Sequence, residues 1–172
     1  MSSTPAAPLP TSAELVLTRV INAPRDLVWQ AHTDCAHLKH WWGPKGFTLH
    51  TCKMDLRPGG TFLYGMTSPT GQPMWGRWVF REIVAPERLV YVVSFSDENA
   101  GVTRHPMAPK WPAEMLCIGT FAEQDGRTLM TSRITAINAD AEESAIFEAG
   151  FDSMRGGFGA TWDQFDAYLA KL

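Results

Sequence analysis

The sequence predicts an α+β protein in which one curved antiparallel sheet wraps around a long C-terminal helix, with two short helices closing one end. Three observations favour this fold. Short segments of alternating hydrophobicity follow one another between residues 46 and 137, and tight turns join them. Residues from about 140 to 172 instead carry apolar side chains at steps of three and four. A long apolar helix beside a single sheet buries its apolar stripe on that sheet.

The N-terminal part predicts one strand and two short helices. The segment "ELVLTRVINAP", from residue 14, is rich in β-branched and aliphatic side chains and ends at a proline, which is typical of a strand. Pro24 suits the first position of a helix over "RDLVWQAHT". Asp34 can cap a second helix, "CAHLKHWW". Residues 1–13, rich in Pro, Ala and Ser, predict a disordered or loosely docked arm ahead of a single domain at residues 14–172.

Two adjacent tryptophans in "WWGPKGF", residues 41–47, lie where this helix ends. Neighbouring helical residues point about 100° apart, since a turn takes roughly 3.6 residues. Trp41 and Trp42 therefore cannot both face one flat core. We predict that they lie at a corner beside the end of a cavity, with at least one ring buried, and that Gly43 and Pro44 turn the chain into the sheet.

Six strands are expected between residues 46 and 137, separated by turns such as "RPGG", "SPTGQP", "PER" and "QDG". Strand parity groups large side chains on one face of three of these strands: Phe62, Tyr64 and Met66; Gly76, Trp78 and Phe80; and Tyr91, Val93 and Phe95. A long loop over residues 96–114 holds Trp111 among prolines, which favours a lid or an interface with another subunit of a homodimer.

The C-terminal helix is expected to run from about Asp140 to Leu172, with Asn138 and Asp140 as candidate caps. Its apolar stripe consists of Phe147, Phe151, Met154, Phe158, Trp162, Phe165, Leu169 and Leu172. The glycines of "RGGFG" each cost a helix roughly 1 kcal/mol relative to alanine. They therefore predict a kink or a very close approach of the helix to the sheet.

Charge and cysteine usage limit the class of protein. The formal net charge of −3 argues against binding to nucleic acid or to an anionic membrane through bulk electrostatics. Neither a signal peptide nor a stretch long enough to span a membrane is evident. Cys35, Cys52 and Cys117 are odd in number and form no C-x-x-C pair, so we expect reduced thiols in a cytoplasmic protein.

No catalytic signature is present, and we expect no metal and no cofactor. His37 and His40, at i and i+3, could share a helix face and bind a transition metal, with His32 nearby. No acidic third ligand has a fitting spacing, so a solvated helix surface is the simpler interpretation. Parity makes Glu82 the best candidate for a base in a cavity, and a strand-end carboxylate paired with an arginine is the alternative.

Several segments together resemble a known superfamily: "LTRVINAPRDLVWQAHTD", "HLKHWWGPKGF", "CKMDLRPGG", "REIVAPERLVY" and "TWDQFDAYLA". Over nearly everything from residue 14 onwards the chain is similar to SRPBCC or START-like proteins. Within them it resembles the group named after the C-terminal domain of the activator of the heat-shock chaperone ATPase. The resemblance implies a helix-grip fold with a ligand-sized cavity between sheet and helix. Chaperone activation is not implied, because the namesake also uses a separate N-terminal domain.

The aromatic content then suggests what the cavity holds. Seven tryptophans and nine phenylalanines concentrate on faces expected to look inward, which fits either a solid aromatic core or a pocket for a small apolar molecule. The resemblance favours the pocket, and "GGFGATW" in the last helix departs from the group's usual G-W segment. We expect ligand contacts from Phe62, Tyr64, Trp78, Tyr91, Phe95, Phe151, Met154 and Phe158.

Polar contacts to this ligand are expected from the two tyrosines and from Glu82 or Arg19. Two other functions remain open. The same scaffold could cyclise, dehydrate or hydrolyse its ligand with cavity water and one acid or base. It could also act as a protein-interaction or chaperone-associated domain through an exposed sheet face or the Trp111 loop. A pocket without a facing titratable group favours binding over catalysis.

Overall fold

The computed structural model describes residues 13–172, which form one sheet and four helices. In chain order the elements are β1 (Glu14–Ile21), α1 (Arg25–Thr33), α2 (Cys35–Leu38), β2 (Thr48–Met54), β3 (Thr61–Thr67), β4 (Pro73–Val84), β5 (Arg88–Ser96), β6 (Val102–Thr103), β7 (Glu114–Gln124), β8 (Arg127–Ile137), α3 (Ala141–Ala149) and α4 (Phe151–Leu169). The arm expected at residues 1–13 lies outside the described residues, apart from Ala13.

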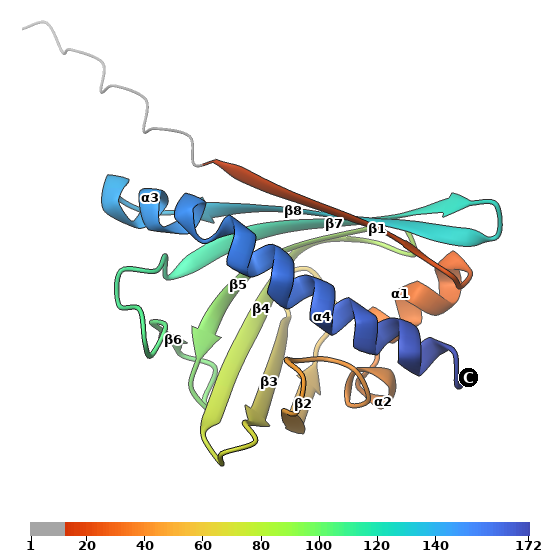
Figure 1. Ribbon diagram of the computed structural model, residues 1–172, viewed down its shortest axis with the longest axis horizontal. Helices are drawn as coiled ribbons and strands as arrows, with labels where there is room; N and C mark the ends of the chain where they lie inside the picture. The colour runs from red at the N-terminus through yellow and green to blue at the C-terminus, as the bar shows by residue number, and fades with distance from the viewer. Residues whose placement is uncertain (1–12) are drawn as a thin grey trace, which may run out of the picture.

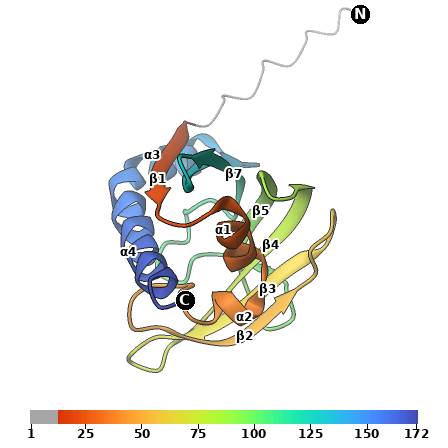
Figure 2. The ribbon, with the colours of Figure 1, turned by 90° about the vertical axis from the view of Figure 1, so that its right-hand side faces the viewer.

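The strands pair antiparallel in the order β1-β8-β7-β5-β4-β3-β2, and the short β6 pairs with β5. Helix α4 crosses the sheet, and α1 and α2 lie at the end where the chain terminates (Figure 1). Figure 2 shows the sheet curving from β1, beside α4, round to β2 on the opposite side. The helix-grip architecture expected from the sequence is therefore confirmed.

Side-chain alternation produces the core as predicted. On β1, Leu15, Leu17 and Ile21 are buried and their neighbours are not. On α4, Trp162 and Phe165 are buried against the sheet side. Among residues 13–172, no helix has both the length and the apolar character required to cross a membrane.

The expected single C-terminal helix is in fact two helices that meet at Gly150. Asp140 caps α3 as predicted, because its Oδ1 accepts a hydrogen bond from the amide of Glu143 at 2.8 Å. The Trp111 ring lies close to this junction, since a Cβ at Gly150 would be 2.8 Å from it. Only glycine fits this contact, and sequence periodicity cannot reveal it because Trp111 lies far away in the chain.

Helix α4 continues without interruption through Gly156, Gly157 and Gly159. A Cβ atom on any of the three would meet no atom within 4 Å. The predicted kink or close approach to the sheet is therefore wrong, and these glycines leave open space instead.

The loop between β5 and β7 packs on α3. The rings of Trp111 and Phe147 have centroids 5.7 Å apart in an edge-to-face arrangement. Arg104 and Glu143 form a 2.9 Å ion pair that ties the loop, directly after β6, to the same helix. Trp111 and Arg104 thus both dock the loop on α3.

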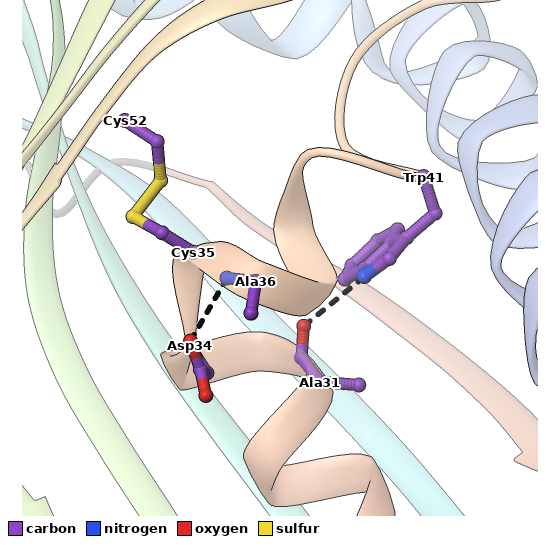
Figure 3. The surroundings of a disulfide bond; sticks show 6 residues. All are labelled: Ala31, Asp34, Cys35, Ala36, Trp41 and Cys52. Carbon is purple, nitrogen blue, oxygen red and sulfur yellow. Dashed lines mark hydrogen bonds between the residues drawn. A yellow bond between two sulfur atoms is a disulfide. The ribbon is translucent and has the colours of Figure 1, made fainter.

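Two of the three cysteines are joined, contrary to the expectation of reduced thiols. A disulfide links Cys35 at the start of α2 to Cys52 on β2, with the Cα atoms 5.8 Å apart (Figure 3). Only Cys117 is a free thiol among the described cysteines, and it is buried. The pairing depends on α2 folding back against β2, which the spacing in the sequence does not show.

Candidate ligand-binding site

A cavity of about 300 Å³ lies between α4, strands β3 and β4, and the segment 42–45 that follows α2. Its wall is formed by Trp42, Gly43, Pro44, Lys45, Tyr64, Met66, Met74, Met154, Gly157, Phe158, Ala160 and Thr161. We call this space the main cavity. Lys45, Gly157 and Ala160 are exposed, so the cavity opens to solvent between the segment 42–45 and α4.

The two tryptophans at this wall have different surroundings. Trp41 is 2% exposed, its indole N–H donates to the Ala31 carbonyl at 3.0 Å (Figure 3), and its ring lies 4.3 Å from that of Phe165. The ring of Trp42 stands at 90° to that of Trp41 and lines the cavity. The corner predicted from "WWGPKGF" is therefore confirmed: one ring anchors the segment and the other faces the cavity.

Gly43 turns the chain at this corner and fastens it to α4. Its φ of +109° is a conformation that favours glycine, and a Cβ there would lie 3.0 Å from the methyl of Met66. Its carbonyl accepts a hydrogen bond from Gln164 Nε2 at 2.7 Å. The wall segment is thereby held on α4 and on β3 at once.

Two smaller cavities adjoin the main one. One, of about 170 Å³, lies between β4, β5 and the Pro112 loop, and shares Tyr64 and Met74 with the main cavity. The other holds about 30 Å³, enough for a single water, and shares Trp42 and Phe158 with it.

Few polar groups face the main cavity. The Trp42 indole nitrogen has no hydrogen-bond acceptor among the described residues, but this atom is buried and does not open to the cavity. Lys45 makes no ion pair within residues 13–172. Burial raises the pKa of Tyr64, so its phenol is a neutral donor. The wall thus offers the Tyr64 and Thr161 hydroxyls and one cation, and no carboxylate.

Six of the eight residues expected to contact a ligand line these spaces. Tyr64, Met154 and Phe158 line the main cavity, and Tyr64 also lines the 170 Å³ cavity together with Phe95. Trp78 and Tyr91 line the smallest cavity, where their rings stack at 3.9 Å.

The remaining two contribute to packing. Phe62 is fully buried behind Trp42, with the ring centroids 6.4 Å apart. Phe151 packs edge-to-face on Phe147 at 5.1 Å, near the break between α3 and α4. Neither lines the three cavities described here.

Several wall residues were missed by the sequence reasoning. Met66 and Met74 share strand parity with Tyr64 and Trp78, so the pattern that selected the aromatic residues also contained these methionines. Lys45 and Thr161 gave no such signal, because their place at the mouth depends on how the segment 42–45 meets α4.

Glu82 does not face any of these cavities, which corrects its assignment as a candidate base. The register of β4 and β5 shifts between Phe80 and Glu82, so the simple alternation fails at that point. Glu82 is exposed and lies 3.4 Å from Arg88 in an ion pair, as the alternative interpretation had it. Arg19, the other polar candidate, is engaged by Asp163 and Asp166 of α4.

The histidines serve separate structural roles. His32 is buried, its Nδ1 donates to the Val28 carbonyl at 2.8 Å, and burial lowers its pKa to about 4. His37 is hydrogen-bonded to the Tyr168 hydroxyl at 2.7 Å, and His40 stacks on the same ring. Within residues 13–172, no three His, Cys, Asp or Glu side chains gather closely enough to hold a metal ion.

Solved structures provide close matches to this fold, whereas no curated protein matches the sequence. A Mycobacterium smegmatis protein is 29% identical with a TM-score of 0.72, over 91% of this chain and 90% of its own. An Arthrobacter aurescens protein is 26% identical with a TM-score of 0.73, over 92% and 87%. The AHSA1 protein from Silicibacter pomeroyi, 20% identical over 92% and 98% with a TM-score of 0.67, shares the fold.

A sequence model of a protein family also matches the chain. The model described as "Activator of Hsp90 ATPase homolog 1-like protein" matches residues 22–170. This range includes α1, the tryptophan corner, the rest of the sheet after β1, and α4. The chain therefore belongs to the family of activator of Hsp90 ATPase homolog 1-like proteins.

Proposed function

We propose that this protein binds a small, largely apolar molecule with one hydrogen-bond acceptor, in the main cavity. The observation that carries the proposal is an apolar cavity of about 300 Å³ whose few polar groups include the Tyr64 phenol and, at the open side, Lys45. Binding sites for small molecules are typically about 300–1,000 Å³, mostly apolar, with a few polar groups that fix orientation. The cavity fits the lower end of that range, which suits a molecule of one or two rings or a short chain.

The wall is suited to an apolar body. Met66, Met74 and Met154 all line it, and unbranched thioether side chains adapt to ligands of different shape. Trp42 and Phe158 supply flat aromatic surfaces against which a ring can pack.

The polar groups suit an acceptor, and an anionic one best. Tyr64 belongs to the wall, and its neutral phenol can donate a hydrogen bond to an acceptor on the ligand. Lys45 lies at the open side and adds a positive charge there. A carboxylate or sulfonate at the open end of the ligand would be attracted to Lys45.

Catalysis by this cavity is less well supported. No carboxylate and no histidine belongs to its wall, and the one acid expected there, Glu82, is exposed elsewhere. The wall therefore lacks a group whose ordinary pKa suits proton transfer near neutral pH.

Two fluorescent probes with the same aromatic skeleton test the proposal: anionic 8-anilinonaphthalene-1-sulfonate and neutral N-phenyl-1-naphthylamine. Both should bind the folded protein saturably, and Met154→Trp should block them by filling the cavity. Arg155→Trp, on the exposed side of the same helix, is the matched control and should leave binding intact. Unchanged binding to Met154→Trp, with circular dichroism showing a folded protein, would place the site elsewhere.

The role of Lys45 is tested by the difference between the probes. The anionic probe should bind about 2- to 5-fold more tightly than the neutral one, as expected for an exposed charge pair. Lys45→Gln should abolish that difference while leaving the neutral probe unaffected. Equal affinities in the wild type would contradict the anionic acceptor but not the apolar site.

A further inference from the structure

We propose that the Cys35–Cys52 disulfide is an exchange site for a small thiol, and that its reduction loosens the wall of the main cavity. The first half of this proposal stands on the surroundings of the disulfide alone. The second half rests on the proposed function, because it concerns the affinity of the same cavity.

The disulfide is accessible. Both cysteines are partly exposed and line a surface hollow of about 270 Å³, which is separate from the main cavity. The hollow is formed by Cys35, Ala36, Lys39, Leu49, His50, Thr51 and Cys52. A molecule the size of a small peptide thiol can therefore enter the hollow beside the two cysteines without unfolding of the protein.

The charges around the hollow favour an attacking thiolate. Lys39 is a cation in its lining, His50 is the other ionisable base, and no carboxylate lines it. The nearest acid in sequence, Asp34, is held by its N-cap bond to the amide of Ala36 at 2.8 Å (Figure 3). Positive charge near sulfur stabilises thiolates, both the attacking one and the one that leaves.

The exchange balances with two equivalents of thiol. The thiolate of the first molecule attacks one cysteine sulfur, the S–S bond breaks, and the other cysteine leaves as a thiolate that takes up a proton. The second molecule attacks the mixed disulfide and releases the first cysteine as a thiol. The protein gains two thiols, and the two small thiols become one disulfide.

The link to the cavity follows from the chain between the two cysteines. Their separation of 17 residues closes a ring that contains the whole wall segment 42–45. The disulfide is the covalent tie between α2 and β2, and β2 is an edge strand paired only with β3. Opening a ring of this size restores conformational freedom to the chain inside it.

Other contacts hold the Trp41–Gly43 end of the segment more firmly than its Pro44–Lys45 end. Trp41 is bonded to Ala31 of α1, and Gly43 to Gln164 of α4 (Figure 3 shows the first). These bonds keep the corner in place, whereas the stretch from Pro44 to β2 has a single backbone bond of its own, from the Phe47 amide to the Pro44 carbonyl. Reduction should therefore loosen the Pro44–Lys45 side of the wall most.

Accessibility is measured by incubating the folded protein in glutathione buffers of increasing reducing strength, followed by alkylation and peptide mass spectrometry. Cys35 and Cys52 should become alkylated together, while the buried Cys117 stays protected. Protection of all three cysteines until denaturant is added would overturn the exchange site.

The coupling is measured by amide hydrogen exchange and by the affinity of 8-anilinonaphthalene-1-sulfonate for oxidised and reduced protein. Reduction should speed exchange of the Phe47 amide and weaken probe binding about 5-fold or more. Cys35→Ala/Cys52→Ala should behave like the reduced protein in either buffer, and Cys117→Ala should keep the redox response.

Each outcome decides a separate point. Equal exchange and equal affinity in both states would overturn the coupling, even where the disulfide is reducible. A probe that binds neither form would contradict the proposed function, and amide exchange alone would then decide whether the segment loosens.

Discussion

At the scale of single residues, we expect Trp41 to contribute mainly to stability and Trp42 mainly to ligand binding. Trp41 is 2% exposed and packs on Phe165, so Trp41→Ala should lower the free energy of unfolding by about 3–5 kcal/mol. Trp42 faces open space on one side, so Trp42→Ala should cost less stability and alter probe binding more. Urea denaturation and probe titration of both variants separate these effects. Equal stability losses for the two would contradict this division.

The buried side chain of His32 makes the free energy of unfolding depend on pH. Its pKa of about 4 in the folded protein lies below the ordinary value of 6.5, so the fold holds the neutral imidazole. The stabilisation is complete above pH 6.5 and is lost as the pH falls from 6.5 towards 4, because only the unfolded chain takes up the proton easily. Over that window the free energy of unfolding should fall by about 3 kcal/mol from this residue alone.

Carboxylates also titrate at low pH, so the measurement is a difference between two proteins. His32→Phe keeps an aromatic ring among Trp41, Phe121 and Phe165 but cannot be protonated. Its urea-unfolding free energy should depend less steeply on pH between 6.5 and 4 than that of the wild type. Parallel curves for the two proteins would show that His32 does not cause the loss.

At the scale of elements, helix α4 contains glycines whose conformational cost is not offset by packing. Gly156 and Gly157 are exposed, and a Cβ on either meets no atom within 4 Å. Gly156→Ala and Gly157→Ala should each raise the free energy of unfolding by about 0.5–1 kcal/mol in thermal or urea melts. A loss of stability in either variant would mean that a contact not seen here requires glycine.

Substitutions at Gly156 and Gly157 also test whether the probe binds in the main cavity, with Gly156 as the control position. Gly157 lines the main cavity and Gly156 does not, although they are neighbours in one helix. A leucine at Gly157 should reduce probe affinity, and a leucine at Gly156 should not. Similar effects at both positions would indicate a general change in the helix rather than a filled cavity.

The elements themselves were largely predictable from short-range patterns. Periods of two and of three to four residues identified the strands and the apolar stripe, and Asp34 and Asp140 marked helix starts correctly. Failures occurred where a distant contact decides the backbone. The last helix is divided at Gly150, where the Trp111 ring leaves no room for a Cβ, and the register shift after Phe80 turns Glu82 outward.

The site was less predictable than the fold for the same reason. Parity placed Tyr64 on the cavity side correctly, since it depends only on its own strand. Lys45 and Gly157 line the mouth because two segments far apart in sequence meet there. The Cys35–Cys52 pairing likewise depends on the approach of α2 to β2.

At the scale of the whole molecule, the side chain of Arg19 connects the first strand, β1, to the last helix, α4. Arg19 follows Leu15 and Leu17 on the inward face of β1, where the other side chains are apolar. Its guanidinium donates to Asp163 and to Asp166, each at 2.6 Å, and to the Gly159 carbonyl at 3.3 Å. This contact holds α4, which carries one wall of the main cavity, against the edge of the sheet.

The two acidic partners should not contribute equally. Asp163 is 71% exposed and Asp166 is 39% exposed, and Asp166 accepts two bonds from Arg19. Exposed ion pairs are worth about 0.2–1 kcal/mol, whereas hydrogen bonds to charged groups in more protected places reach about 1.5–3 kcal/mol. A double-mutant cycle of Arg19→Met with Asp166→Asn should therefore give a coupling energy of about 1–2 kcal/mol, at the boundary of those ranges. The cycle with Asp163→Asn should give less than about 0.5 kcal/mol, and high salt should reduce it further. A larger coupling to Asp163 than to Asp166, measured by urea unfolding, would show that the exposed pair and not the protected one fastens α4 to β1.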